Sequence, residues 1–112
     1  MSKIYNVYSK EDAVERTWYS SSNILYSECY DLNDSLKTLR VVFNNGGTYD
    51  YIGVDVYDYL KFREALSQGK ALNQLIKKYE VSKVPTPYNT EELRKQLQNI
   101  LEDNGKEEEK GQ

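Results

Sequence analysis

Thr48-Tyr49-Asp50-Tyr51-Ile52-Gly53-Val54, preceded by Asn44-Asn45-Gly46-Gly47, is the stretch that decides the fold of this chain. Asn and Gly both tolerate positive φ, so Asn45-Gly46 favours a tight turn between two antiparallel strands. Residues 39–43, before the turn, are rich in β-branched side chains and alternate in polarity, as a half-buried strand does. The sequence therefore predicts a β-hairpin whose returning strand places two tyrosines on one face.

The face on which Tyr49 and Tyr51 lie depends on the length of the turn. A two-residue turn, Asn45-Gly46, would place both tyrosines beside Arg40 as an exposed platform on which bases can stack. A three-residue turn that includes Gly47 would bury both tyrosines in the core. A slip of one residue exchanges the two faces completely. We favour the longer turn, because Gly47 suits its left-handed position and a core role explains the alternation of the preceding strand.

Segments on either side of the hairpin complete the predicted fold. A further strand is expected over residues 23–30. Asp55 is a good N-cap for a helix over residues 56–67, and residues 70–79 carry apolar side chains at the spacing of a second helix. We expect a single α+β domain, in which a three-stranded antiparallel meander is packed by two helices, with helical arms at both ends.

The domain boundaries follow from caps, prolines and charge. Ser9 precedes acidic residues, which predicts an N-terminal helix over residues 10–17. Asp31 to Ser35 reads as a loop, and Pro85 and Pro87 mark a linker. The expected segments are an N-terminal arm over 1–17, the domain over 18–81, the linker over 82–89, an amphipathic helix over 90–103 and a charged, disordered tail over 104–112.

Composition narrows the classes of function. The chain carries 15 Lys and Arg against 18 Asp and Glu, for a net charge of −3, which argues against a general polyanion binder. Tyrosine is abundant, with 11 among 112 residues, and suits both a small core and a binding surface. No apolar run is long enough to span a membrane, and Cys29 is the only cysteine. We expect a cytoplasmic protein without a disulfide or a membrane partner.

The absence of histidine from the sequence excludes the commonest catalytic and metal-binding sets. Cys29 has no histidine to activate it as a nucleophile, and the usual zinc ligands cannot be assembled. The Gly46-Gly47 pair joins two strands and is not followed by the Lys-Ser/Thr of a phosphate-binding loop. We therefore expect no enzyme activity and no cofactor.

Two groups of polar residues are candidate ligand contacts. Arg40, Tyr49 and Tyr51 form the first group if the turn has two residues. The second group comes from the helix over 70–79 and the start of the strand over 23–30, and consists of Lys70, Asn73, Lys77, Lys78, Ser21 and Ser22. Lysines on a helix face more often meet only solvent, and serines at the start of a strand more often bond the backbone.

The helix over 90–103 carries the narrow apolar stripe Leu93, Leu97, Ile100 and Leu101. A helix of three turns is too short to be stable alone, so this stripe must pack against something. It can dock on its own domain, on a second copy of the chain or on a partner. We expect that it mediates self-association or partner binding, because residues 18–79 already hold enough apolar side chains to close a core.

Between Trp18 and Tyr79 the chain resembles the KTSC domain family, whose name refers to the C-terminus of certain lysyl-tRNA synthetases. The matching residues are Ser21, Ser22, Ile24, Tyr30, Asp31, Leu39, Val41, Phe43, Gly46, Gly47, Tyr49, Tyr51, Val54, Tyr57, Ala65, Ser67, Gly69, Lys70, Asn73, Ile76 and Tyr79. Asp55 stands where many relatives have proline, which changes how the helix begins. The resemblance implies a small non-catalytic domain with a role in RNA binding.

Our leading expectation for function is therefore a small non-catalytic binding module with RNA as its ligand. The alternative is a protein–protein interaction module, such as an adaptor or inhibitor of a host protein encoded by a phage or mobile element. A third possibility is capture of a small nucleotide by the tyrosine-rich surface. A basic environment around the largest exposed tyrosine cluster would favour RNA, and an apolar one would favour a protein.

Overall fold

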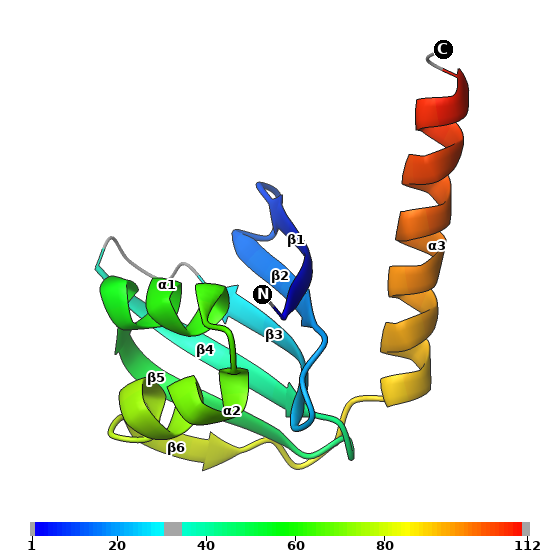
Figure 1. Ribbon diagram of the computed structural model, residues 1–112. Helices are drawn as coiled ribbons and strands as arrows, with labels where there is room; N and C mark the ends of the chain where they lie inside the picture. The colour runs from blue at the N-terminus through cyan, green and yellow to red at the C-terminus, as the bar shows by residue number, and fades with distance from the viewer. Residues whose placement is uncertain (1, 31–34, 111–112) are drawn as a thin grey trace.

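Six strands form one antiparallel sheet in the computed structural model, which describes residues 2–30 and 35–110, with side chains through Asp103 (Figure 1). The strands are β1 (Lys3–Ser9), β2 (Val14–Tyr19), β3 (Ile24–Tyr30), β4 (Leu36–Phe43), β5 (Thr48–Asp55) and β6 (Glu80–Lys83). Each strand pairs with the next one in the chain, so the sheet is a meander. The expected α+β class and antiparallel sheet are confirmed, but the sheet has six strands rather than three. The predicted loop over 31–35 lies outside the described residues except for Ser35.

The N-terminal helix predicted over residues 10–17 is wrong, because this region forms the β1–β2 hairpin. The Ser9 hydroxyl accepts a hydrogen bond from the backbone N–H of Asp12, 3.4 Å away, as an N-cap would. The chain then turns at Ala13, whose φ is +55°, and returns as β2. A serine can cap a turn and a helix with the same local bond, so the capping signal did not distinguish them.

The predicted proline linker, 82–89, begins inside a strand. β6 pairs with β5, Tyr49 opposite Lys83 and Tyr51 opposite Val81, at the edge of the sheet. All four β6 residues are exposed, so the strand has no buried apolar alternation that a sequence pattern could detect. Its register is set by backbone hydrogen bonds to β5.

The β4–β5 hairpin places both tyrosines on the side of the core, as we favoured. Tyr49 pairs with Val41, and the N–H of Phe43 donates to the carbonyl of Gly47 at 2.9 Å, so the turn consists of residues 44–46. The two-residue alternative is wrong. The observed register also differs from the favoured one by two residues, with Gly46 at φ +94° in the left-handed position. A shift of two residues leaves every side chain on the same face.

Two short helices follow β5 and cover one face of the sheet (Figure 1). Helix α1 (Val56–Glu64) begins where predicted, because Asp55 accepts a hydrogen bond from the N–H of Tyr57 at 2.8 Å. The predicted helix over 70–79 is shorter and starts earlier, as α2 (Gln68–Ala71), which continues into a π-helical turn, η1 (Leu72–Ile76). The amide of the fully buried Gln68 donates to carbonyls at the end of α1, including that of Ala65 at 3.0 Å.

The main core fills the space between this face of the sheet and the helices. Phe62 of α1 meets the ring of Tyr19 edge-on, with 5.8 Å between centroids. The cluster's buried members are Tyr19, Ile24, Cys29, Leu39, Val41, Tyr51, Val54, Tyr59, Phe62, Ala71, Leu72 and Ile76. We call this side of the sheet the helix face.

Helix α3 (Thr90–Lys110) lies on the opposite side of the sheet and runs beyond it (Figure 1). It is seven residues longer than predicted and continues into the segment expected to be disordered; residues 111 and 112 lie outside the described chain. Its first turns cover a second cluster, whose buried members are Trp18, Leu25, Tyr26, Val42 and Leu93. We call this side the α3 face.

Candidate functional site

An aromatic hollow opens on the helix face beside the sheet edge, where β5 and β6 pass the end of η1. We call it the aromatic groove, and its volume is about 390 Å³. The residues that line it are Phe43, Tyr49, Tyr51, Val81 and Lys77. Strand pairing explains the assembly, because Tyr49 and Tyr51 alternate with polar residues and Val81 pairs directly with Tyr51.

The two outer rings of the groove pack against each other. Phe43 and Tyr49 meet edge-on, with ring centroids 5.8 Å apart and planes at 86°. Both side chains are half-buried and therefore keep ring surface in contact with solvent. Tyr51 is only 5% exposed, and burial raises its pKa above the ordinary value for tyrosine. Tyr51 thus serves as the floor of the groove, whereas Phe43 and Tyr49 are its accessible walls.

Two lysines give this region a positive charge. Lys77, at the end of η1, lines the aromatic groove, and Lys83 lies opposite Tyr49 on β6. Both side chains are exposed, and neither forms an ion pair within the described part of the chain. By contrast, Lys78 is held 2.9 Å from Asp58. Lys77 and Lys83 are therefore available to an anionic ligand.

The structure separates Arg40 from the two tyrosines with which the shorter turn would have grouped it. Arg40 points to the α3 face, where Nε and Nη2 bind the two carboxylate oxygens of Asp50 at 2.7 and 2.8 Å. This fork is the main reason that the pKa of Arg40 lies above its ordinary value. The guanidinium also lies over the rings of Tyr30 and Tyr88, 5.7 and 5.8 Å from their centroids. Arg40 is thus committed to contacts within the fold.

Beside Arg40, a buried carboxylate binds several tyrosines. Glu28 is 6% exposed, and it accepts hydrogen bonds from the hydroxyls of Tyr26 at 2.6 Å, Tyr88 at 2.8 Å and Tyr30. Burial is the largest cause that raises the pKa of Tyr26, and the hydrogen bond to Glu28 adds to it. Because a buried carboxylate must be satisfied, this network holds β3 to the segment that carries Tyr88.

The remaining predicted ligand residues do not gather at the groove. Lys70 and Asn73 are exposed on α2 and η1, and neither lines the groove. Ser21 bonds the backbone at the start of β3, as its sequence context favoured, since its hydroxyl accepts from the N–H groups of Asn23 and Ile24 at 3.2 and 3.3 Å. Ser22 is exposed at the same turn. Of the predicted set, the structure brings together Tyr49, Tyr51 and Lys77.

Phe43 and Val81 of the groove, and Lys83 beside it on β6, are residues that the sequence analysis did not single out as ligand contacts. Phe43 was assigned to the core by its alternation, and it is indeed packed against the main cluster on one side. Val81 was counted within the domain, and Lys83 fell in the segment assigned to the linker. The signal that could have found them is the pairing of an exposed edge strand with β5, which depends on the tertiary structure.

The apolar stripe of α3 packs largely on its own domain. Leu93 is 5% exposed, and its carbonyl accepts a hydrogen bond from the indole N–H of Trp18 at 3.0 Å. Leu97 and Ile100 are half-buried against the same cluster, whereas Leu101 is 46% exposed. Docking on its own domain, one of the three possibilities, therefore accounts for three of the four residues. Self-association or partner binding through the stripe stays a prediction.

A smaller hollow of about 180 Å³ lies at the other end of the helix face, where Cys29 and Tyr59 line it. The hydroxyl of Tyr59 donates to Glu15, which also accepts from Arg63 at 3.0 Å. Cys29 is 5% exposed. Among the described residues, no group of three or more His, Cys, Asp or Glu side chains is arranged to hold a metal ion.

The fold and the groove define a class of small α+β domain, in which an antiparallel meander carries helices on one face and an aromatic hollow at its edge. The chain belongs to the KTSC domain family, because the sequence model of that domain matches residues 20–79. None of the curated proteins matches the chain. None of the helices, over the residues that the structure describes, has the length and apolar character needed to cross a membrane.

Proposed function

We propose that this protein is a non-catalytic module that binds single-stranded RNA through the aromatic groove. The observation that carries the proposal is the composition of the groove. Its solvent-facing rings, Phe43 and Tyr49, lie beside Lys77, and within the described residues its lining contains no acidic side chain. A chain with a net charge of −3 that keeps a cation beside two aromatic rings is suited to an anionic ligand with flat bases.

The geometry favours unpaired bases over a duplex. Base stacking on an aromatic side chain requires a base that has left its own stack, and every base offers a flat face for it. The ring of Tyr49 provides such a surface at the rim, while Lys77 can contact the adjoining phosphate. The resemblance to the KTSC family supports RNA as the form of nucleic acid. We expect binding to take place in the cytosol. We also expect no turnover, because the sequence contains no histidine for the commonest catalytic sets.

A titration of fluorescently labelled single-stranded RNA tests this proposal. Tyr49→Ala should weaken binding by about 1–3 kcal/mol, the usual effect of losing one stacking ring. Lys77→Glu should weaken binding further at low salt and reduce its salt dependence, since it removes a phosphate contact. Lys77 is exposed, so this variant is expected to fold normally.

Matched controls exist on distant surfaces. Tyr57 is 70% exposed on α1, and Lys95 is exposed on α3. Tyr57→Ala and Lys95→Glu should leave RNA binding unchanged. The proposal fails if the parent protein shows no affinity for single-stranded RNA, or if the control variants lose as much affinity as the groove variants. An equal titration with single-stranded DNA establishes whether the 2′-hydroxyl contributes.

A protein partner is the second candidate function, favoured by one observation at the opposite edge of the sheet. β1 is the outermost strand, and it exposes Ile4 at 43%, Val7 at 36% and Tyr8 at 49%. An edge strand with exposed apolar side chains can accept a strand from another chain. Replacing Val7 by lysine should abolish capture of such a partner while leaving RNA binding intact.

A further inference from the structure

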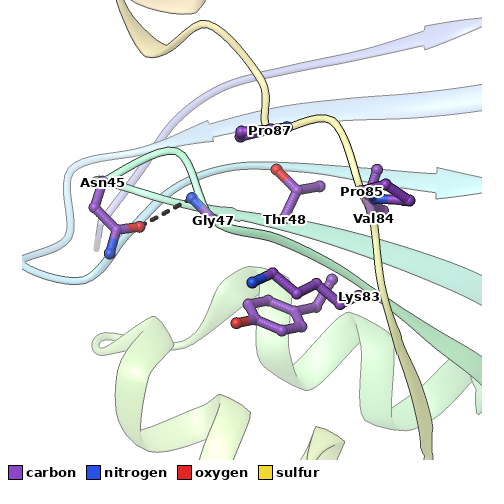
Figure 2. A pocket seen from close by; sticks show the side chains of 8 residues that line it. Asn45, Gly47, Thr48, Lys83, Val84, Pro85 and Pro87 are labelled. Atoms are coloured by element: carbon purple, nitrogen blue, oxygen red, sulfur yellow. Dashed lines mark hydrogen bonds between the residues drawn. The ribbon is translucent and has the colours of Figure 1, made fainter.

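A second hollow adjoins the aromatic groove where the chain leaves β6. We call it the turn hollow, and its volume is about 350 Å³. One side is formed by Asn45 of the β4–β5 turn and by Gly47 directly after it, and the other by Pro85 and Pro87 (Figure 2). Lys83 lies at its lower side in the same view. The proline segment, residues 84–89, is called the strap.

Contacts on both sides hold the strap in place. The N–H of Val84 donates to the carbonyl of Thr48 at 2.9 Å, which continues the β5–β6 pairing by one residue. Further along, the strap passes close to Gly46. A Cβ atom added at Gly46 would lie 3.3 Å from the carbonyl oxygen of Tyr88. The hydroxyl of Tyr88 then reaches Glu28 on the α3 face. The wall of the turn hollow is therefore already formed before any ligand binds.

The two hollows are neighbours, because Tyr49 lines both of them. A third hollow of about 230 Å³ shares Phe43 and Tyr49 with the aromatic groove, and shares Asn45 and Gly47 with the turn hollow. Lys83 is paired with Tyr49 on the neighbouring strand and lines the turn hollow together with it. Lys83 is the charged residue of the turn hollow, just as Lys77 is that of the aromatic groove.

We propose that the site accommodates two successive nucleotides of a single strand, with one base in the aromatic groove and the next against the strap. Lys83 contacts the phosphate that joins them. This inference rests on the proposed RNA binding at the groove. It adds a second subsite, one side of which lies beyond residue 79, where the match to the family ends. The strap thus sets the length of ligand that this particular chain prefers.

The chemistry of the turn hollow fits a base and its phosphate. The proline rings present apolar surface to a base, and the ammonium group of Lys83 is a strongly hydrated point charge suited to phosphate. The Oδ1 atom of Asn45 accepts the N–H of Gly47 at 2.9 Å, as the dashed line in Figure 2 shows. Its amide NH₂ is the group that remains to donate to a carbonyl on the base.

The test is a titration of the full chain with uridine monophosphate, the dinucleotide UpU and a tetrauridylate. Affinity should rise about tenfold or more from the mononucleotide to the dinucleotide, as one added stack and one added phosphate contact predict. The further gain from the dinucleotide to the tetranucleotide should be smaller. The same series in deoxyuridine establishes whether ribose matters.

Variants at Lys83 separate this inference from the proposed function. Lys83→Met and Lys83→Glu should reduce the gain between mononucleotide and dinucleotide, because the phosphate that joins the two nucleotides loses its cation. Lys83 is exposed, and thermal melting checks that each variant is folded. Lys95→Glu is the matched control, and it should keep the full gain.

Three results would overturn the inference. A mononucleotide that binds as tightly as the dinucleotide would remove the second subsite but leave the groove as the proposed binding site. Equal gains with every added nucleotide would indicate diffuse attraction to charge, with no defined second position. If none of the three ligands binds the parent protein, both the inference and the proposed function fail.

Discussion

The two faces of the sheet are stabilised by different chemistry. The helix face closes over a continuous apolar cluster of twelve buried residues, with Phe62 fully buried at its centre. The α3 face has a smaller apolar cluster around Trp18, beside the charged network of Glu28, Arg40 and Asp50. On the first face the main stabilising contribution is burial of apolar surface, and the Tyr59–Glu15–Arg63 hydrogen bonds lie at one end of it. On the second face, burial of apolar surface and hydrogen bonds both contribute. A buried polar group there is costly if it loses its hydrogen-bond partner.

This difference follows the boundary of the family match. Most of the helix-face cluster falls within residues 20–79, whereas Trp18, Tyr88 and Leu93 lie outside the match. The segments added at both ends of the domain therefore meet on the α3 face and cover it together. They also supply β1, β2 and β6 to the sheet. We infer that the matched region provides a core of its own, and that the added segments enlarge the sheet and close its second face.

High pH should have the largest effect, because it acts on both faces at once. Burial raises the pKa of Tyr19 and Tyr59 on the helix face and of Tyr26 and Tyr30 on the α3 face. These groups stay protonated in the folded chain, whereas in the unfolded chain they ionise near pH 10. The stability they contribute is complete below about pH 10 and is lost as the pH rises above it.

We therefore expect cooperative unfolding in alkali. The measurement follows circular dichroism and tyrosinate absorbance in the same titration, and the larger part of the absorbance should appear together with the loss of the circular dichroism signal. If most of the tyrosinate absorbance appeared near pH 10 while the fold persisted, these hydroxyls would be open to solvent and the packing of both faces would be wrong.

The substitution Phe62→Ala tests the apolar face. It removes a fully buried ring from the centre of the main cluster and should cost about 3–5 kcal/mol of unfolding free energy. Denaturant unfolding followed by circular dichroism measures the loss. Leu66→Ala, at a side chain that is 80% exposed, is the control and should change little. A cost below about 1 kcal/mol for Phe62→Ala would mean that the helices contribute little to the core.

Leu93→Ala tests the docking of α3 and should cost about 2–3 kcal/mol, at the lower end for a buried leucine because the cluster is smaller. Trp18 is the only tryptophan and contacts Leu93, so its fluorescence should shift to the red when α3 detaches. Leu101→Ala, at an exposed position, is the control. An unchanged spectrum and stability in Leu93→Ala would show that α3 does not dock in solution.

Truncation after Val84 is a second test of whether α3 docks on the sheet. Loss of residues 85–112 should lower the melting temperature, because it removes both Tyr88 and Leu93 from the α3 face. The mass in solution of the full and truncated chains then tests the separate prediction that α3 mediates self-association. A full chain that is monomeric at high concentration would contradict self-association without affecting the docking.

Tyr88→Phe should have the smallest effect, about 1–2 kcal/mol, because it removes one hydroxyl that donates to Glu28 and accepts from Arg40. The carboxylate keeps its bonds from Tyr26 and Tyr30, so the loss is partial. Tyr57→Phe, at an exposed tyrosine, is the matched control. Equal stabilities for the two variants would show that the Glu28 network does not hold the strap.

The candidate site shows where prediction from the sequence ends. Tyr49 and Tyr51 were expected on the core side because strand alternation is a local property, and the structure places them there even though the turn differs from the expected one. Lys77 was recognised as a candidate, but its position beside Tyr49 depends on how η1 packs against β5. Lys83 could not be recognised, because an exposed four-residue edge strand leaves no hydrophobic pattern.

The sequence by itself determined the features that are settled by neighbouring residues: the β4–β5 hairpin, the face on which Tyr49 and Tyr51 lie and the start of α1 at Asp55. Only the tertiary structure decided that residues 3–9 and 80–83 become strands, that Arg40 binds Asp50, and that α3 covers Trp18. The physical reason is the range of the interactions. A cap or a turn is stabilised within a few residues, whereas a short edge strand and a docked helix are stable only when distant parts of the chain supply their partners.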